Sequence, residues 1–539
     1  MIMKRIDLKI LFVAILALLA GCMKDEVEFN DVSYKRPVNI AVPVSTINAD
    51  YNSILRRLAK NDGKSVPDIK SKDDGMLYVE YDKDYHIGWA DVLTMNNIQL
   101  SLNSPMPLTQ GGKINRTVTE RIKLNADDGQ RIDSLIIAKA AMTVKAEPMD
   151  VDGQYTLNIA ELNKGGRPLA ISWAAQSGCD QEIDLAGYTI VPKHSTDSSY
   201  LTISISLNGT AKSTSISSAF TLNLSTTDIE PQIVFGFFGT RLVYNSPSEM
   251  PLDFFDSYEF NDGIEFTGTN LTLDVNNWTG TQFDVTMDIM RLVERDNVTE
   301  NIKFDIENKL YVDQVSHDAY RPDGNFKPCA NKFTLDTANS DVNTLLSIDP
   351  ISYKYSILVT SNPKGETKEN YLTPESSLDC HVNMYIPLWM KITDMDRTDT
   401  IDFDLNSIII DKDNADYVDT LSLYFDFGNG FPLTMLTQAY LVDGQMQIVD
   451  SLFPHFEQVW KMPKIDANKR VSEWAHVSKT AVMDQEKIKR CSDADVKKIL
   501  LKSIIDTKNA GEYQFFKFYN EYAMKIKFSF EVVSNYLSD

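Results

Sequence analysis

The sequence predicts a mainly β protein made of several antiparallel β-sandwich domains with a few short helices. The clearest evidence is the C-terminal stretch 524–532, where apolar side chains occupy every second position. That period is typical of a strand with one buried face, because strand side chains alternate between the two faces of a sheet. A unit of strand, polar turn and strand at 135–159 recurs at 264–289 and 408–435. We expect each unit to be an antiparallel hairpin that buries one face.

The N-terminus has the organisation of a secretory signal. Basic residues precede the apolar run Ile10–Leu19, which is about half the roughly twenty residues needed to cross a bilayer. The run ends in Leu-Ala-Gly-Cys, and this ending resembles a bacterial lipoprotein lipobox. The resemblance implies a signal peptide at 1–21 and acylation of the Cys22 thiol. Two or three acyl chains, at about 0.8 kcal/mol per buried CH₂, would then hold the mature chain at the membrane.

Residues 22–35 are short, polar and acidic, which is typical of a flexible tether. Within them, Lys24, Asp25 and Glu26 resemble the acidic export signal of surface lipoproteins in the Bacteroidota. That resemblance implies an outer-membrane lipoprotein exposed at the cell surface. A plain solvated linker is the alternative interpretation of the same three residues.

Charge and hydropathy limit the partners. The 539-residue chain has a formal charge of −23, and removing the +2 of the signal peptide leaves about −25. Such a chain lacks the positive footprint that nucleic acid or bare anionic lipid requires, so we expect no nucleic-acid partner. No second apolar stretch approaches membrane-spanning length, so we expect the acyl chains alone to contact the membrane.

The folded part is expected to begin at residue 36 with an N-terminal sandwich domain over 36–240. The polar stretch Thr240–Pro251 is interpreted as the main domain boundary. The C-terminal sandwich region, 241–539, can be divided into modules at about 241–400 and 401–539. The spacing of the three strand–turn–strand units suggests related modules, although alternation produces such likeness in any sandwich.

The order of elements near the start carries a second resemblance. A strand is followed by a short helix at 50–59, an acidic turn and the strand Leu77–Tyr81, and this order resembles large, uncharacterised surface lipoproteins of the Bacteroidota. The segments Ile132–Leu135, Phe235–Gly239 and Phe518–Tyr522 resemble the same proteins. The resemblance implies a surface lipoprotein and no established activity.

The sequence has no G-x-S-x-G elbow, no H-E-x-x-H pair and no phosphate-binding loop. We therefore expect no catalysis and no cofactor. Beyond Cys22 there are four cysteines, and a bridge between Cys329 and Cys380 is the pairing to test first. Carboxylates at Asp411, Asp413 and Asp416 are a calcium candidate, but the loop lacks the glycine of an EF-hand, and a solvated turn is the simpler interpretation. No other metal site is predicted.

Two tryptophans are candidates for stacking on a ligand, Trp89 near the first sheet and Trp278 in a polar turn. The alternative is that both are core residues. We expect a binding or assembly role, with an unknown protein, glycan or lipid as the ligand. One alternative is a carrier of lipid or another apolar ligand in an elongated β-lined cavity, and a second is a glycan-binding accessory lipoprotein.

Overall fold

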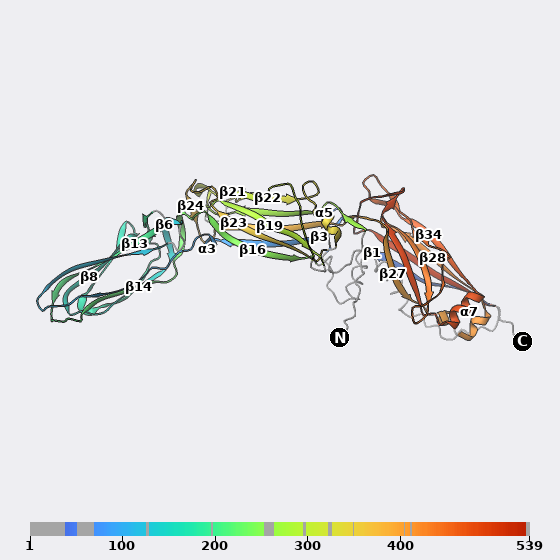
Figure 1. The fold of residues 1–539 in the computed structure, drawn as a ribbon, viewed down its shortest axis with the longest axis horizontal. Helices are drawn as coiled ribbons and strands as arrows, with labels where there is room; N and C mark the ends of the chain where they lie inside the picture. Colours follow the sequence, from blue (N-terminus) through green and yellow to red (C-terminus); the bar gives the residue numbers. More distant parts are fainter. Residues whose placement is uncertain are drawn as a thin grey trace.

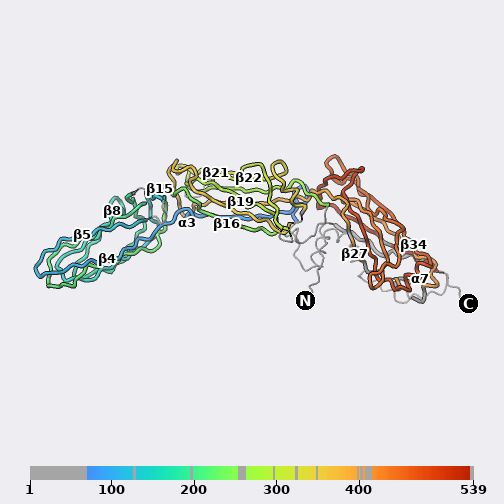
Figure 2. Tube along the Cα trace, viewed as in Figure 1, coloured from blue at the N-terminus to red at the C-terminus, as the bar shows by residue number. Residues whose placement is uncertain are grey.

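The computed structural model describes residues 38–50, 69–124, 129–195, 198–252, 263–294, 298–321, 326–348, 350–403, 405–409 and 412–534. They form an elongated molecule in which three β-sandwich modules follow one another in a row (Figure 1; Figure 2). We call them the tip, middle and base modules; in Figure 1 the tip is blue to green and the base is orange to red. The predicted antiparallel, mainly β class is confirmed.

The base module packs two sheets. One has the order β1 (Val38–Asp50), β39 (Ala523–Ser534), β28 (Val418–Asn429) and β34 (Ala475–Asp484). The other has the order β27 (Met395–Asp402), β35 (Lys498–Asp506) and β29 (Thr434–Val442), and β29 also pairs with β30 (Ile448–Ser451) and β31 (Glu457–Trp460). Helix α7 (Gln485–Asp493) follows β34, and the Asp484 side chain caps it by accepting from the backbone N–H of Lys487.

The middle module repeats this plan. Its first sheet has the order β3 (Leu77–Gly88), β25 (Ser377–Pro387), β18 (Asn270–Asn277) and β22 (Cys329–Leu335), with β2 (Ile69–Ser71) beside β3. Its second sheet has the order β16 (Arg241–Pro251), β23 (Ser352–Ser361) and β19 (Phe283–Val293), and β19 also pairs with β20 (Thr299–Asn301) and β21 (Lys309–Val312).

The tip module has the same two-sheet plan as the base and middle modules. Its first sheet has the order β4 (Gln99–Pro105), β14 (Ala219–Thr226), β7 (Ala141–Ala146) and β10 (Cys179–Asp184). In its second sheet β13 (Ser198–Ala211) lies between β5 (Lys113–Lys123) and β8 (Val151–Lys164), and β8 also pairs with β9 (Arg167–Ala174). Four strands extend this sheet: β6 (Arg131–Lys139), β11 (Thr189–Ile190), β12 (Lys193–Ser195) and β15 (Glu230–Phe237).

The three modules therefore share one topology. We letter the strand positions of a module A to H along the chain, and position E is filled by one or two short strands. In each of the three modules the first sheet then has the order A-H-C-F and the second has the order B-G-D-E. Position A, for example, is β1 in the base, β3 in the middle and β4 in the tip, and position H is β39, β25 and β14. This two-sheet arrangement is a jelly roll. The recurrence of the three sequence units thus reflects a recurring fold.

The modules are nested along the chain. The A strands come first, in the order base, middle and tip, and the tip module then finishes before the middle and the base. The predicted boundary near residue 240 coincides with the passage from the tip to the middle module, between β15 and β16. However, the proposed domain 36–240 does not match the strand pairing, because β1 pairs with β39 and β3 pairs with β25. The stretch 240–251, expected to be a linker, is largely the strand β16, which pairs with β23.

The expectation that the three repeated units are hairpins was wrong. In each unit the two strands lie in different sheets of the same sandwich: β7 and β8 in the tip, β18 and β19 in the middle, β28 and β29 in the base. The alternating apolar positions were interpreted correctly as core positions, since the apolar side chains at alternate positions of the first strands are buried, for example Met142 and Val144 of β7 and Leu421 and Leu423 of β28. The turn between the strands carries the chain from one sheet across to the other.

A buried asparagine builds this turn in two modules. In the middle module Asn277 Nδ2 donates to Thr281 O (2.7 Å) and Asp313 O (2.8 Å), and its Oδ1 accepts from Thr279 N (3.0 Å). In the base module Asn429 Nδ2 donates to the fourth residue on, Leu433 O (2.8 Å), and to Lys461 O (3.0 Å). Its Oδ1 accepts from the second residue on, Phe431 N (2.9 Å). One side chain thus satisfies three backbone groups in each turn.

The C-terminal strand β39 has the predicted alternation. Met524, Ile526, Phe530 and Val532 are buried, whereas Lys527 between them is exposed. The side chain of Phe528, also expected in the core, lies outside the described part. The short helix expected at 50–59 lies almost entirely outside the described residues.

Shorter elements join the modules. Strand β24 (Asn370–Leu372) of the middle module pairs with β15 of the tip, next to helix α3 (Trp89–Val92). Between middle and base, β26 (Trp389–Ile392) lies between β17 (Ile264–Phe266) and β38 (Phe516–Lys517). The remaining elements are η1 (Ala175–Ser177), η2 (His317–Ala319), α5 (Val342–Leu345), η3 (Leu346–Ile348), α6 (Leu405–Ile408), η4 (Lys412–Tyr417), β32 (Lys464–Ile465), β33 (Val471–Glu473), β36 (Lys508–Asn509) and β37 (Glu512–Tyr513).

The four cysteines of the described part are free, so the suggested bridge is not formed. Cys329 on β22 and Cys380 on β25 lie on opposite sides of β18. Two strand spacings, about 9.5 Å, separate them, and a disulfide needs Cα atoms within about 7 Å.

The asparagine turn leads to a stability prediction. Asn429→Ala removes the partners of three backbone groups, and a buried group left unpaired costs about 1–3 kcal/mol. We expect a loss of about 2–4 kcal/mol in the free energy of unfolding of the base module, measured by urea denaturation. As a matched control, Asn223→Ala on the tip removes an exposed asparagine bonded to Ser101 and should cost less than about 0.5 kcal/mol. Equal effects of the two substitutions would contradict the assigned role.

Candidate functional site

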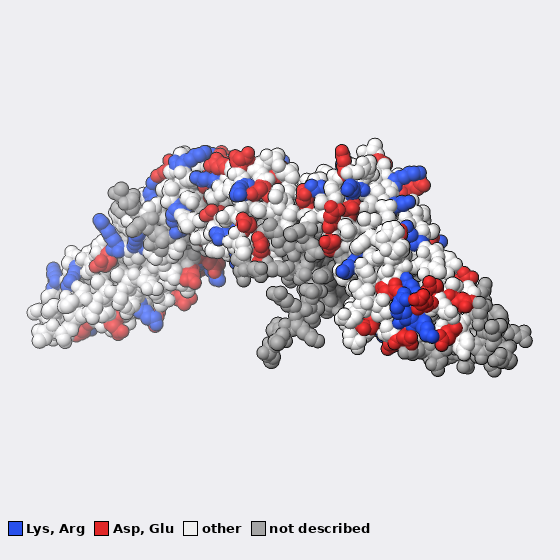
Figure 3. All heavy atoms as spheres, turned by 45° about the vertical axis from the view of Figure 1, so that its right-hand side comes forward, with Lys and Arg blue, Asp and Glu red and all other residues white. Residues whose placement is uncertain are grey.

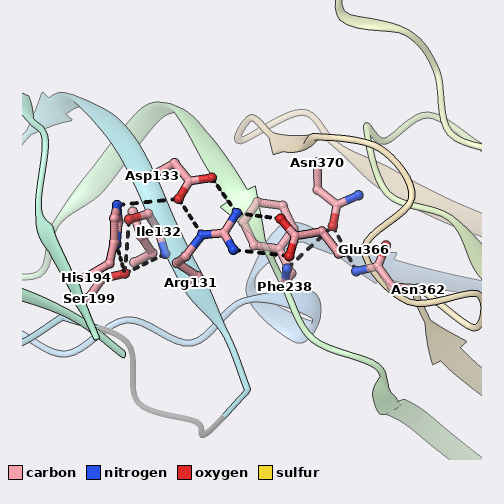
Figure 4. Close-up of polar contacts among 9 residues, drawn as sticks. All are labelled: Arg131, Ile132, Asp133, His194, Ser199, Phe238, Asn362, Glu366 and Asn370. Atoms are coloured by element: carbon pink, nitrogen blue, oxygen red, sulfur yellow. Dashed lines mark hydrogen bonds and ion pairs between the residues drawn. The ribbon is translucent and has the colours of Figure 1, made fainter. Parts of the chain in front are cut away.

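The joint between the tip and middle modules brings together functional groups from distant parts of the chain (Figure 4). Arg131 on β6 is held by Asp133, with Nε to Oδ1 at 2.6 Å and Nη2 to Oδ2 at 3.0 Å. It also reaches Glu366 of the middle module, with Nη1 to Oε2 at 3.1 Å and Nη2 to Oε1 at 2.5 Å. The hydrogen bonds to both carboxylates raise the pKa of Arg131. The guanidinium is therefore a permanently charged clamp across the joint.

On the tip side of this clamp, a serine, a histidine and an aspartate lie next to one another in the order of a hydrolase triad, but with the partners of the two imidazole nitrogens exchanged (Figure 4). Ser199 Oγ is 3.3 Å from His194 Nδ1, and His194 Nε2 is 3.6 Å from Asp133 Oδ1. The serine is fully buried, and its hydroxyl accepts from Ile132 N (2.8 Å) and donates to Ile132 O (3.0 Å). Such a serine cannot meet a substrate, so we assign these contacts to the structure of the joint.

On the middle-module side, Asn362 closes the loop that carries Glu366. Its φ of 43° lies in the left-handed region that asparagine tolerates better than most residues. Its Nδ2 donates to Asn370 Oδ1 (2.8 Å) and to Gly239 O (3.2 Å), in the connection from the tip. These contacts position the loop against the tip module.

An aromatic cluster lies at the same end of the middle module and includes the predicted Trp278. Its ring centroids form a chain of contacts: Trp278 to Phe326 (5.4 Å), Phe326 to Tyr320 (5.3 Å), Tyr320 to Tyr371 (5.8 Å), Tyr371 to His317 (5.4 Å) and His317 to Phe235 of the tip (5.1 Å). Tyr371 is buried, which raises the pKa of its hydroxyl, whereas Trp278, Tyr320 and Phe326 are half-buried and His317 is exposed. Partly exposed rings beside polar groups suit a ligand with both apolar and hydroxyl surfaces.

The other predicted aromatic residue, Trp89, begins helix α3 at the same joint. It is partly buried and packs against the hydrophobic core. The alternative interpretation, a core tryptophan, therefore describes Trp89 better than it describes Trp278.

A groove of about 620 Å³ lies on the outer face of the second sheet of the base module. Its lining includes Leu436 and Ile504 together with three carboxylates, Asp394, Asp396 and Asp506. Thr434 Oγ1 donates to Asp506 (2.5 Å). At the rim Tyr513 donates to Asp394 (2.6 Å), which raises the pKa of Tyr513 to about 12. An apolar floor with carboxylate acceptors can bind hydroxyl or cationic groups.

Most other predicted site residues lie outside the described part of the chain. Cys22 and the segment Lys24–Glu26 do, as do Asp411 and the side chain of Asp413. The third calcium candidate, Asp416, forms an ion pair with Lys489 (2.6 Å). Among the described residues, no helix has the length and apolar character that a membrane span needs.

A polar cluster that was not predicted from the sequence lies on the outer face of the middle module and is formed by Asp82, Asp84 and His381. Asp82 and Asp84 stand two apart in β3, which is the spacing that places both on one face. That spacing was the only available signal, because His381 lies 297 residues from Asp84 in the sequence.

Comparison with known proteins identifies no family for this chain. No family model matches it, and no curated protein matches it. Among solved structures, it is similar to a putative secreted protein from Parabacteroides distasonis, with 13% identity over 57% of this chain and 90% of that one and a TM-score of 0.28. It is also similar to Broad Bean Stain Virus, with 11% identity over 55% of this chain and 90% of that one and a TM-score of 0.16.

Proposed function

We propose that this protein is a lipid-anchored outer-membrane rod, displayed at the cell surface, with a binding or assembly role and no catalysis. The observation that carries the proposal is the position of the first described strand. Val38, at the start of β1, pairs with Ser534, the last residue of β39. The other end of β39 begins at Ala523, shortly after Asn520, whose N–H donates to Gly75 O beside the middle module. Val38 therefore lies at the opposite end of the strand pair from the middle module. An acylated Cys22, joined to Val38 by residues 23–37, would attach that end to the membrane and direct the tip module away from it.

The packed interior supports binding over the carrier alternative. A tunnel for an apolar ligand would leave some inward-facing side chains accessible to a water-sized probe. Eight inward-facing residues of the middle module have no accessible surface: Leu271, Leu273, Val285, Met287, Ile357, Val359, Val382 and Met384. They belong to one continuous buried core, and such packing favours a ligand on the outer surface.

The surface charge argues against nucleic-acid binding. Acidic and basic side chains are interspersed over the visible face (Figure 3). The basic side chains of α7 are partly exposed but form ion pairs with carboxylates, Arg490 with Asp450 and Lys489 with Asp416, so they do not form an unpaired basic patch. A charge near −25 would repel phosphate backbones.

Acylation of Cys22 leads to the first test. Cys22→Ser removes the thiol that receives the acyl chains, so the variant should leave the detergent phase in Triton X-114 partitioning. The unsubstituted chain should stay in the detergent phase. Unchanged partitioning of Cys22→Ser would refute the lipid anchor.

Surface exposure is tested separately. If Lys24, Asp25 and Glu26 form an export signal, protease added to intact cells should degrade the unsubstituted protein. Replacing all three residues with alanine should protect the protein while it still partitions with detergent, because lipidation does not need them. Degradation of both forms to the same extent would show that these three residues are only part of a tether and not an export signal.

The aromatic cluster favours a glycan as the ligand. Sugars present apolar C–H faces to aromatic rings and hydroxyl groups to polar side chains, and Trp278, Tyr320 and Phe326 offer partly exposed rings. The exposed residues Arg321 and Lys327 follow two of these rings in the chain. We therefore propose glycan binding at this joint as a second, more specific function.

Trp278→Ala should weaken binding to any polysaccharide that retards the protein in affinity gel electrophoresis, by about tenfold if one ring stacks on one sugar. A loss of about 1.4 kcal/mol corresponds to that factor. Trp474→Ala removes a partly exposed tryptophan of the base module and should leave retardation unchanged. If neither variant changes retardation, the glycan site is not at Trp278.

A further inference from the structure

The first sheet of the middle module presents an imidazole and two carboxylates on its outer face. Asp82 and Asp84 lie on β3, and His381 lies directly opposite Asp84 on the neighbouring strand β25. Because all three positions face outward from paired strands, their backbones are held by the sheet rather than by a loop.

The three side chains already converge. His381 Nδ1 is 2.7 Å from Asp84 Oδ1, and one ligand atom from each of the three residues lies within 4.8 Å of the other two. Two ligands of a tetrahedral Zn²⁺ ion, each bonded at about 2.0–2.2 Å, are about 3.3 Å apart. A small opening of the His381–Asp84 contact would therefore admit an ion.

The charges around the cluster also suit a cation. Among the described residues, neither Asp82 nor Asp84 forms an ion pair with a lysine or arginine, and the nearest lysine in sequence, Lys83, donates instead to Ser248 Oγ (3.4 Å). Two neighbouring carboxylates repel each other unless a positive charge lies between them. A divalent ion would supply that charge.

We propose that Asp82, Asp84 and His381 form a surface site for a divalent transition metal ion of the Zn²⁺ type. Three protein ligands leave a fourth position for water or for a group of a partner molecule. On binding, the ion takes the place of the hydrogen between Nδ1 and Oδ1. A neutral imidazole that donated from Nδ1 transfers this single proton through solvent to Nε2, and a protonated imidazole keeps its Nε2 proton and releases the Nδ1 proton to solvent.

The neighbouring cross-strand pair provides a matched control. His86 Nδ1 is 2.7 Å from Asp379 Oδ1, the same kind of contact two residues along the same two strands, with the histidine on β3 and the aspartate on β25. The His86 pair is not part of the three-residue cluster among the described residues. Removal of His86 therefore changes the surface in a similar way without removing a proposed ligand.

The test is calorimetric titration of Zn²⁺ into the full chain in detergent, purified without a histidine tag. We expect one bound ion at neutral pH. His381→Ala and Asp82→Asn should each weaken binding about tenfold or more, whereas His86→Ala should leave it unchanged. Thermal melting without metal should be nearly the same for all variants, since Asp82 and His86 are exposed and His381 is only half-buried.

Two results would overturn the site. The first is no Zn²⁺ binding by the unsubstituted chain at neutral pH. The second is loss of affinity in His86→Ala equal to that in His381→Ala, which would show that the surface binds metal without this cluster. Neither result bears on the lipid anchor or on the glycan proposal, which rest on other residues.

Discussion

The pairing of each module's first strand with its last strand is the constraint on which the rest of the structure depends. In the base module these strands are β1 and β39, from opposite ends of the chain, and in the middle module they are β3 and β25, separated by the whole tip. Closing such long loops costs entropy before any contact compensates for it. Only the tip module is continuous in sequence, so nesting favours folding from the tip outward and makes the closure of each module depend on the one inside it.

The turns that cross each sandwich show why the sequence units recur. A chain that leaves one sheet for the other interrupts both hydrogen-bond ladders, and the freed backbone groups lie in a buried corner. Asn277 and Asn429 each make three bonds, of which two are at the same offsets, to the second and the fourth residue on. The third bond goes to a more distant carbonyl, of Asp313 or Lys461. The tip module lacks the asparagine and uses backbone bonds instead, from Met149 N to Ala175 O (2.8 Å) and from Val151 N to Met149 O (2.7 Å). The middle and base modules therefore resemble each other more closely here than either resembles the tip.

Local features could be predicted from the sequence, and long-range pairing could not. The alternation in β39 was predicted because strand period is a local signal. The polar composition of 240–251 was also a local signal, but this stretch is largely the strand β16. The same alternation gave the wrong pairing for β28 and β29, since a buried face does not identify the sheet that a strand joins. For the same reason Trp278 was a reasonable candidate by itself, but the rings around it, from Phe235 to Tyr371, became visible only in the fold. His381 was not associated with Asp84 because nothing in the sequence relates β25 to β3.

Nesting also restricts how far neighbouring modules can bend or rotate relative to one another. Modules joined in simple succession share one covalent connection, which leaves rotation about the joint free. Here the chain passes each joint twice, through α3 and the β15–β16 connection between tip and middle, and pairing of β15 with β24 adds a strand contact. The Arg131 clamp then joins Asp133 of the tip to Glu366 of the middle with paired bonds to each carboxylate, a geometry that a single rotatable ammonium could not reproduce. Because two chain crossings and a charged clamp restrict bending and rotation together, a ligand bound beside this joint would be held at a fixed distance and orientation from the base module.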